Sequence, residues 1–283
     1  MNSVIKIDKL VKQYTNFELN ITTDFPKGYI TGIIGGNGAG KTTLINSILN
    51  IIKAESGLIY VDGNNINDES FIYKDKIGIV LDSNFFPSFW TAETLEKNIS
   101  PYYNHWSHKK YMDYIDIFNL DKEKTISSLS KGMQMKLMLA VALAHGSKTL
   151  ILDEPTSGLD PISRNELLEI LQEFVQTESN SVIFSTHITN DLEKIADYII
   201  YLIKGKIDYS GTKDMFLENY RIVQGSKDKL NDNLIKFMIA NEISDYGFRS
   251  LIETKNLSNF KNDDFQILNP SIEEIMIFKN KNK

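Results

Sequence analysis

The sequence contains no cysteine, which excludes disulfide frameworks, thiolate metal sites and cysteine nucleophiles. It also lacks a long hydrophobic run. The longest candidate, residues 196–203, is interrupted by Asp197 and falls far short of the roughly 20 residues that a membrane-spanning helix needs. The first residues show no hydrophobic segment of the secretory type. We therefore expect a soluble chain, in which any membrane role depends on a partner.

The sequence also has fewer basic residues than acidic ones. The 31 lysine and arginine residues are outnumbered by 37 aspartate and glutamate residues, so the net charge is −6. This balance argues against a broad basic surface, and we expect no nucleic-acid partner. The 283 residues suit one large α/β domain with a smaller appendage.

The most informative segment is residues 35–43, a glycine-rich loop whose first eight residues read Gly-x-x-x-x-Gly-Lys-Thr. A hydrophobic run at 29–34 precedes it as a strand, and residues 44–49 follow it as a helix. Its glycines let the backbone turn tightly and point N–H groups inward at a helix N-terminus, which makes an anion site. Lys41 can reach the β- and γ-phosphates, and the Thr42 hydroxyl can ligate Mg²⁺. The loop predicts binding of a nucleoside triphosphate.

A second buried strand ends in two adjacent carboxylates. Residues 149–152 are hydrophobic or uncharged, and Asp153 and Glu154 follow them directly. Beside a phosphate-binding loop, Asp153 can hold Mg²⁺ directly or through water. Glu154 would face the γ-phosphate side, where a base must polarise the attacking water. This pair predicts hydrolysis of the bound nucleotide.

Short hydrophobic strands alternate with amphipathic helices along most of the chain, which is typical of an α/β sheet. Lys204 and Gly205 predict the turn of a final hairpin, and a capping box from Ser163 to Glu166 predicts a helix start. The expected strands cover residues 4–7, 29–34, 58–61, 77–81, 150–152, 182–185, 198–203 and 207–209.

Two regions break this alternation. Residues from about 84 to 144 contain no convincing strand but two helical patterns, which predict a helical insert. From residue 211 to 283 the alternation weakens, and a helix should start around Pro270, with the proline just inside it. We therefore expect a main domain over residues 1–210 and a small accessory domain over 211–283.

The ordered set of motifs resembles the ATP-binding subunits of ABC transporters over about residues 1–211. Residues 35–43 match their Walker A motif and 150–154 their Walker B motif. Residues 129–133 stand where their Leu-Ser-Gly-Gly-Gln signature belongs, and 157–160 match their D-loop. The resemblance implies an α/β fold: a RecA-like P-loop core with an N-terminal antiparallel β edge, a helical subdomain and a small C-terminal accessory domain.

The same resemblance implies ATP and Mg²⁺ as cofactors and assigns the site residues. Catalytic roles fall to Lys41, Glu154 and His187, the last as a switch histidine that can donate a hydrogen bond to the γ-phosphate. The implied nucleotide contacts are Tyr14, Gly35, Asn37, Gly38, Ala39, Gly40, Lys41, Thr42, Thr43, Ser130, Gly132 and Asp160. The implied metal contacts are Thr42, Asp153 and Asp82.

The chain departs from the family pattern at two motifs. In the signature, Lys131 replaces the first glycine and Met133 replaces the final glutamine. Asp82 stands where the family has a glutamine, so it is either a metal contact or part of a plain structural turn. An ionised carboxylate there cannot donate a hydrogen bond. These departures resemble a branch of exporter ATPases from Gram-positive bacteria, which includes exporters of antimicrobial or cytolytic peptides.

The resemblance also implies partners. In this family Ser130 and Gly132 contact the ATP of the opposite subunit, so we expect a head-to-tail dimer, either a homodimer or a heterodimer with a second ATPase subunit. A separate membrane-spanning subunit would carry the substrate pathway and hold the chain at the cytoplasmic face of the cell membrane. The aromatic segment 85–90 either receives a short helix of that subunit or fills the core of the helical insert.

Three other functions fit parts of the pattern. A soluble ABC-type ATPase acting on DNA needs a long insert between its Walker motifs, and Lys41 and Asp153 lie too close together for one. A ribosome-associated ABC protein needs two cassettes in one chain, and this chain has one. A catalytically silent regulatory subunit would not need Lys41, Glu154 and His187 together. The sequence therefore favours an ATPase subunit that powers transport, and the resemblance implies that the direction is export.

Overall fold

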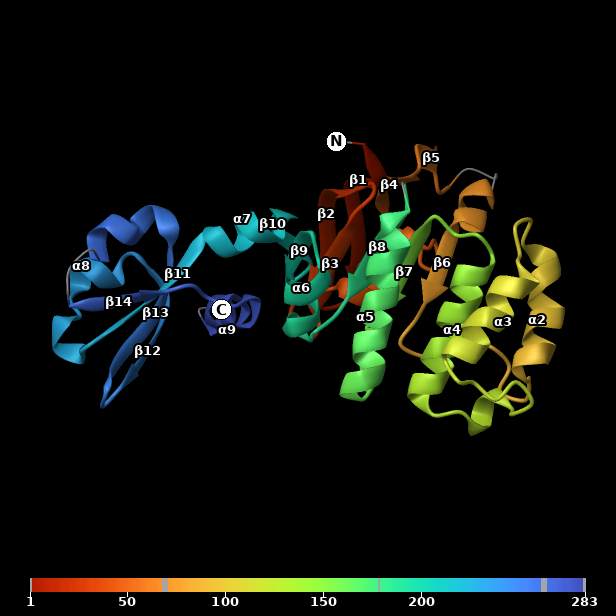
Figure 1. Cartoon of the computed structure of the whole chain (residues 1–283). Helices are drawn as coiled ribbons and strands as arrows, with labels where there is room; N and C mark the ends of the chain where they lie inside the picture. The colour runs from red at the N-terminus through yellow and green to blue at the C-terminus, as the bar shows by residue number, and fades with distance from the viewer. Residues whose placement is uncertain (1, 68–70, 178, 261–263, 282–283) are drawn as a thin grey trace.

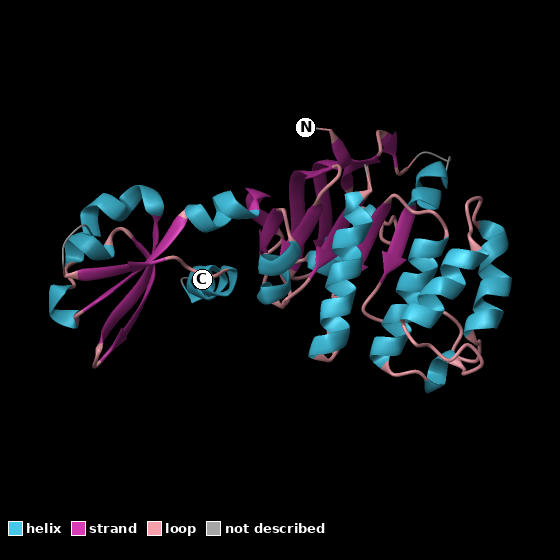
Figure 2. Cartoon of the chain, in the orientation of Figure 1, coloured by secondary structure: helices cyan, strands magenta, loops and turns pink. Residues whose placement is uncertain are grey.

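The computed structural model describes residues 2–67, 71–177, 179–260 and 264–281. Within these ranges the strands form three sheets, of four, six and four strands. Figure 1 shows the two N-terminal sheets close together, with the third sheet at the other end of the molecule. The same view coloured by secondary structure places helices around both parts (Figure 2).

The central six-stranded sheet has the order β10-β9-β3-β8-β7-β6. All its pairs are parallel except β9 with β10, which form a hairpin. Every residue of β3, β7 and β8 is buried, as expected for parallel strands that are covered on both faces. The bounds are β3 Ile30–Ile34, β6 Ile77–Val80, β7 Thr149–Asp153, β8 Ser181–Ser185, β9 Tyr198–Ile203 and β10 Lys206–Thr212.

The predicted hairpin turn lies where the sequence places it. Lys204 has φ 48° and Gly205 has φ 77°, the left-handed pair that a tight hairpin turn requires. A Cβ on Gly205 would also lie 1.8 Å from the carbonyl oxygen of Glu18, so the turn packs against the neighbouring sheet.

The N-terminal sheet is antiparallel and has the order β2-β1-β4-β5. The sequence interpretation missed β2, although its inward positions Leu19, Ile21, Thr23 and Phe25 alternate with exposed ones. The side chains of Leu19, Ile21 and Phe25 pack with α1 and the central sheet into one buried cluster. The bounds are β1 Ser3–Tyr14, β2 Phe17–Pro26, β4 Ser56–Val61, β5 Asn64–Asn65 and α1 Lys41–Ile48.

The region expected to be a helical insert contains three α-helices. Its described residues form no strand longer than the single bridge between Thr91 and Thr125. Tyr111 and Ile115 are buried between these helices at the predicted helical spacing. The bounds are α2 Ala92–Ile99, α3 His108–Ile117 and α4 Lys131–Ala144, with short 3₁₀ turns at Ser100–Tyr102 and Ile126–Ser128. A further 3₁₀ turn, Phe71–Lys76, comes before the insert and leads into β6.

Two predicted helix starts are wrong in detail. Helix α5 (Pro161–Gln176) begins before the expected capping box, because the side chain of Asp160 accepts the N–H groups of Ile162 and Ser163. Helix α9 (Ile272–Lys281) begins after Pro270, so the proline lies outside the helix. Glu274 and Ser271 instead exchange hydrogen bonds there as a capping box.

The C-terminal residues form a four-stranded antiparallel sheet of order β12-β13-β11-β14, which the sequence interpretation did not foresee. A small core of Val223, Phe248, Ile252 and Phe260 lies on one face of it. The bounds are β11 Tyr220–Gly225, β12 Met238–Ser244, β13 Gly247–Glu253, β14 Phe265–Leu268, α7 Lys213–Glu218 and α8 Asp232–Ile235, with 3₁₀ turns at Lys227–Lys229 and Thr254–Phe260. Helix α6 (Thr189–Ile195) lies earlier in the chain, between β8 and β9.

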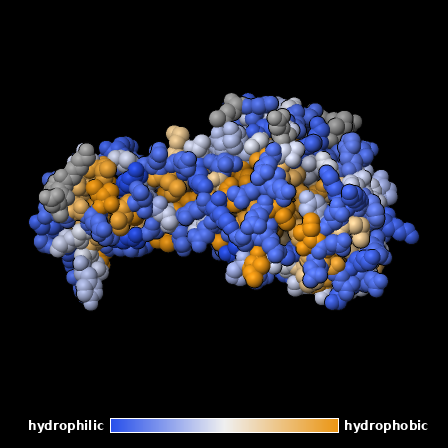
Figure 3. All heavy atoms as spheres, in the orientation of Figure 1, coloured by the Kyte–Doolittle hydropathy of each residue, from blue (hydrophilic) through white to orange (hydrophobic). Residues whose placement is uncertain are grey.

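Hydrophilic residues cover most of the visible face of the molecule, and hydrophobic ones gather over the C-terminal sheet (Figure 3). In the described part of the chain, no helix has the length and apolar character that crossing a membrane requires.

Candidate active site

The loop between β3 and α1 has backbone geometry that only glycine provides easily. Gly38 and Gly40 have φ of 76° and 106°, in the left-handed region. A Cβ on Gly40 would lie 2.8 Å from the ring of Phe17, and one on Gly35 would lie 2.6 Å from the carbonyl oxygen of Leu202. The sequence therefore places glycines where the loop bends back on itself against β2 and β9.

Lys41 is buried beneath this loop. Its ammonium group donates a hydrogen bond to the carbonyl oxygen of Gly35 at 2.9 Å. It also lies 3.8 Å from a carboxylate oxygen of Glu154. The lysine thus joins the start of the loop to the predicted base.

A cavity of about 710 Å³ opens over the loop. Tyr14 stands at its edge, 43% exposed, with its ring centroid 6.2 Å from that of Phe17. The sequence interpretation missed Asn16, in the turn after β1, and Phe17, the first residue of β2, although both lie within three residues of Tyr14. The cavity is lined by Tyr14, Asn16, Phe17, Asn37, Gly38, Ala39, Gly40, Lys41, Thr42, Thr43 and Glu154.

Glu154 is held in an unusual conformation. Its φ of 51° is in a region that non-glycine residues rarely adopt and that costs on the order of 1–3 kcal/mol. Its N–H donates to the carbonyl and hydroxyl oxygens of Ser185 on β8. Strained residues that the surrounding structure holds in place are concentrated at functional sites.

The carboxylate of Glu154 binds His187. One oxygen lies 2.6 Å from Nδ1 of the histidine and accepts its backbone N–H at 3.1 Å. The other oxygen faces Lys41. The three predicted catalytic residues, which are far apart in the sequence, therefore form one connected chain beside the cavity.

The three predicted metal contacts lie in different surroundings. The carboxylate of Asp153 is buried and accepts a hydrogen bond from Ser185, while Thr42 lies exposed at the start of α1. Asp82 binds Lys131 at 2.6 Å instead. No group of three or more histidine and carboxylate side chains could hold a metal ion within the described ranges. One hydroxyl and one carboxylate still fit Mg²⁺, which usually keeps several waters and binds substrate phosphates.

Ser130, Gly132 and Asp160 do not line the cavity. The Ser130 hydroxyl caps α4 by accepting the N–H of Met133 at 3.2 Å. A Cβ on Gly132 would lie 2.8 Å from the side chain of Leu159, so the signature segment touches the D-loop of its own chain. Bonds from the backbone and hydroxyl of Ser163, and from the backbone of Ile162, hold the pKa of Asp160 below its ordinary value.

Comparison with known proteins agrees with this geometry. The family model described as ABC transporter matches residues 19–157. The chain is 31% identical over 229 residues to the lantibiotic transport ATP-binding protein SrtF of Streptococcus pyogenes, covering 75% of this chain and 94% of that protein. The chain belongs to the ABC transporter ATP-binding proteins. It is an ATP-binding and ATP-hydrolysing subunit, and the predicted family and fold class are confirmed.

Two further relatives extend the comparison. The bacitracin transport ATP-binding protein BcrA of Enterococcus faecalis is 31% identical over 211 residues, covering 73% of this chain and 68% of that one. Among solved structures, an ATP-binding subunit of an ABC transporter aligns with a TM-score of 0.67 and 26% identity, covering 75% of this chain and 91% of that one. The CbiO1 subunit of Clostridium perfringens aligns with a TM-score of 0.63 at the same identity, covering 76% of this chain and 91% of its own.

Proposed function

We propose that this subunit binds MgATP over the loop of residues 35–43 and uses its hydrolysis to drive export of an antimicrobial peptide through a separate membrane-spanning subunit. The connection of Lys41, Glu154 and His187 beside the cavity carries the proposal, because it joins a phosphate ligand, a base and a hydrogen-bond donor. The names of SrtF and BcrA, which are lantibiotic and bacitracin transport proteins, support the substrate class.

The hydrolysis would use Glu154 as general base. In the resting arrangement its two oxygens face Lys41 and His187. A bound triphosphate would offer Lys41 a stronger partner than Glu154 or the Gly35 carbonyl. When Lys41 turns to the phosphates, the Glu154 oxygen that faced it would become free to accept the proton of the attacking water. His187 would keep the carboxylate oriented and donate toward the γ-phosphate.

Thr42 and Asp153 are the residues that would hold Mg²⁺. When bound, the ion would neutralise charge on the β- and γ-phosphates. The Ser185 hydroxyl donates to Asp153 and accepts from the Glu154 N–H, so it would hold the two carboxylates in fixed positions relative to each other.

The proposed catalytic assembly is a head-to-tail dimer with a second copy or a related ATPase subunit. Ser130, Gly132 and Asp160 lie together near the D-loop, outside their own chain's cavity. They would contact the nucleotide held by the partner subunit, where the capped start of α4 offers N–H groups to a phosphate.

We propose that the membrane-spanning subunit docks a short helix in a hollow of about 770 Å³ beside α4. Phe85 and Tyr102 lie along it, 54% and 83% exposed, while Phe86 is half-buried. Phe89, 74% exposed, lies outside the lining but close by in the chain. Aromatic side chains are favoured anchors in contacts of this kind. Docking there would place the subunit at the cytoplasmic face of the membrane.

The test combines docking with transport. Co-expressed with its membrane subunit, the wild-type chain should co-purify, whereas Phe85→Ser and Tyr102→Ser should lose the complex but keep the basal ATPase rate. Ile117→Ser is the matched control, since Ile117 is 65% exposed but does not line the hollow. Inside-out vesicles with both subunits should accumulate a labelled antimicrobial peptide only when ATP is hydrolysed. A complex that survives both aromatic substitutions would place the docking surface elsewhere, and peptide uptake without ATP would contradict the export function.

A further inference from the structure

Helices α5 and α6 each begin at a segment that the proposed function uses. Helix α5 starts directly after Asp160, and α6 starts two residues after His187, which binds Glu154. The two helices are in contact, and Leu168 of α5 and Leu192 of α6 are buried in the same hydrophobic cluster. A displacement of one helix along the other would therefore change the relative position of the two segments that precede them.

A loose ion pair joins the first turns of these helices. Nε of Arg164 on α5 lies 3.9 Å from a carboxylate oxygen of Asp191 on α6, about 1 Å farther than in a charge-assisted hydrogen bond. The side chain of Asp191 is only 3% exposed. Among the residues that the structure describes, neither Nε of Arg164 nor Oδ2 of Asp191 has a hydrogen-bond partner, although both atoms are buried. Buried charged groups without hydrogen bonds cost free energy, so the resting arrangement leaves this contact unsatisfied.

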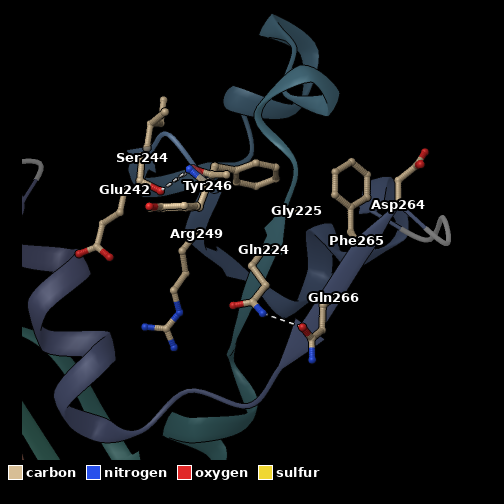
Figure 4. Close-up of a pocket in the computed structure, with 12 residues that line it drawn as sticks. Gln224, Gly225, Glu242, Ser244, Tyr246, Arg249, Asp264, Phe265 and Gln266 are labelled. Atoms are coloured by element: carbon tan, nitrogen blue, oxygen red, sulfur yellow. Dashed lines mark hydrogen bonds between the residues drawn. The ribbon is translucent and has the colours of Figure 1, made fainter.

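The other arginine–carboxylate pair in the described ranges is fully formed. Arg249 of β13 donates a hydrogen bond to Glu274 of α9, the helix that lies between the C-terminal sheet and the ATPase core (Figure 1). Figure 4 shows Arg249 on the sheet beside Gln224 and Glu242, the residues directly opposite it on the neighbouring strands. The wide separation of Arg164 and Asp191 is therefore particular to the contact between α5 and α6.

A second polar contact between α5 and α6 tolerates movement. Lys194 of α6 donates a hydrogen bond to the side chain of Asn165 on α5, at the exposed surface. Because the lysine stem is long and flexible, this bond can persist when one helix shifts by about 1 Å. It therefore keeps α5 beside α6 without fixing the distance between Arg164 and Asp191.

We propose that Arg164 and Asp191 are positioning residues that couple the D-loop to His187. When Asp160 engages the nucleotide held by the partner subunit, α5 shifts along α6 by about 1 Å, and the pair closes into a charge-assisted hydrogen bond. The closed pair holds α6, and with it His187, in the arrangement that hydrolysis requires. ATP bound at one site of the dimer thereby promotes hydrolysis at the other. This inference rests on the proposed head-to-tail dimer.

The test measures ATPase rates of the full chain against ATP concentration, with nucleotide titration alongside. Asp191→Asn keeps the size of the side chain but removes its charge. It should lower kcat about two- to tenfold, the effect of losing one hydrogen bond, and bring the Hill coefficient for ATP toward one. The Kd for ATP, measured at protein concentrations too low for dimers, should stay unchanged, and so should the melting temperature. Arg164→Lys keeps the positive charge and should retain most of kcat and of the cooperativity.

A double variant and a matched control test whether the pair itself carries the effect. Combining Arg164→Gln with Asp191→Asn should lower kcat no further than Asp191→Asn alone, because both substitutions break the same contact. Lys194→Ala removes the exposed contact between the same helices and should leave kcat and the Hill coefficient unchanged. Additive losses in the double variant, or an equal loss in Lys194→Ala, would overturn the coupling, since general loosening of the two helices would then explain them.

The wild type separates this inference from the function on which it rests. A cooperative wild type with unchanged kinetics in Asp191→Asn would overturn the coupling and leave the dimer standing. A wild type without cooperativity, whose rate per subunit does not depend on protein concentration, would remove the dimer and the coupling with it. A melting temperature of Asp191→Asn that falls together with its kcat would assign the pair to stability alone.

The double variant also covers a failure of Asp191→Asn to fold, because neither charge of the pair remains in it. Its kcat and Hill coefficient are then compared directly with those of the wild type. Wild-type values in the folded double variant would overturn the coupling.

Discussion

The two sheets on either side of α9 differ in what covers them. The inner strands β3, β7 and β8 of the central sheet are buried on both faces, and polar side chains gather where these strands end, at Asp153, Glu154 and His187. The C-terminal sheet has its small core on one face and α9 on the other, while its edge strands β12 and β14 are largely exposed. The central sheet therefore places its charged groups at strand ends, beside the phosphate-binding loop. The C-terminal sheet places polar residues along its strands, where Arg249 and Glu242 pair with residues of α9.

The substitution with the largest expected effect is Glu154→Gln, directly after strand β7 of the central sheet. The amide keeps the shape but cannot accept a proton, so kcat should fall by on the order of 10²–10⁴. ATP binding should persist, and stability should change little. Steady-state ATPase rates and nucleotide titration measure the two effects. Glu173→Gln, an exposed substitution on α5, serves as control. Near-normal turnover of Glu154→Gln would show that the base is another residue.

The second test removes packing from the small core of the C-terminal sheet. Phe260 is fully buried in the small C-terminal core, and Phe260→Ala should reduce the free energy of unfolding by about 3–5 kcal/mol. The control, Tyr246→Ala, alters a side chain that is 99% exposed and should have an effect within about 0.5 kcal/mol. Chemical denaturation measures both. A small effect of Phe260→Ala would mean that the C-terminal core contributes little to the folded state.

The third test separates two roles of Asp160. Asp160→Ala removes the cap of α5 and should cost about 1 kcal/mol of stability. Asp160→Asn keeps a good cap and should retain the melting temperature. If Asp160 also contacts the partner's nucleotide, both variants should lose ATPase activity in the dimer. Full activity of Asp160→Asn would assign the residue to capping alone.

The smallest expected effect concerns pH and the contact between α9 and the C-terminal sheet. Burial by itself would raise the pKa of Glu274, but the N–H of Ser271 and the Arg249 guanidinium outweigh it and hold that pKa below 4.5. The stabilisation from the ionised carboxylate is therefore present above pH 4.5 and is lost as the pH falls through the folded pKa.

Glu274→Gln lacks this contribution at every pH. Its melting temperature should be slightly below that of the wild type at pH 7, and the difference should vanish in more acidic solution. Glu273→Gln, on the exposed side of the same turn, should match the wild type throughout. A difference between Glu274→Gln and the wild type that persists unchanged below pH 3 would contradict the assigned ion pair.

Most of the ATPase part could be predicted because its signals are local. Strands buried on both faces appear as hydrophobic runs, and a phosphate-binding loop requires glycine and lysine at set offsets. The strands of the C-terminal sheet were missed for the converse reason. In β12 only Ala240 is buried, so neither a hydrophobic run nor a clear alternation marks it. The start of α5 was misplaced because Ser163 and Glu166 have the spacing of a capping box, while Asp160 is the residue whose side chain reaches the free N–H groups.

The sequence by itself determined the loop of residues 35–43, the acidic pair at the end of β7 and membership of the ABC transporter family, because these depend on neighbours within a few positions. Only the tertiary structure decided that Glu154 binds His187, that Asp82 pairs with Lys131 and that Arg249 pairs with Glu274 of α9. Each of these contacts joins residues that are far apart in the chain. Their meeting depends on how strands and helices pack against one another, and no local spacing records that packing.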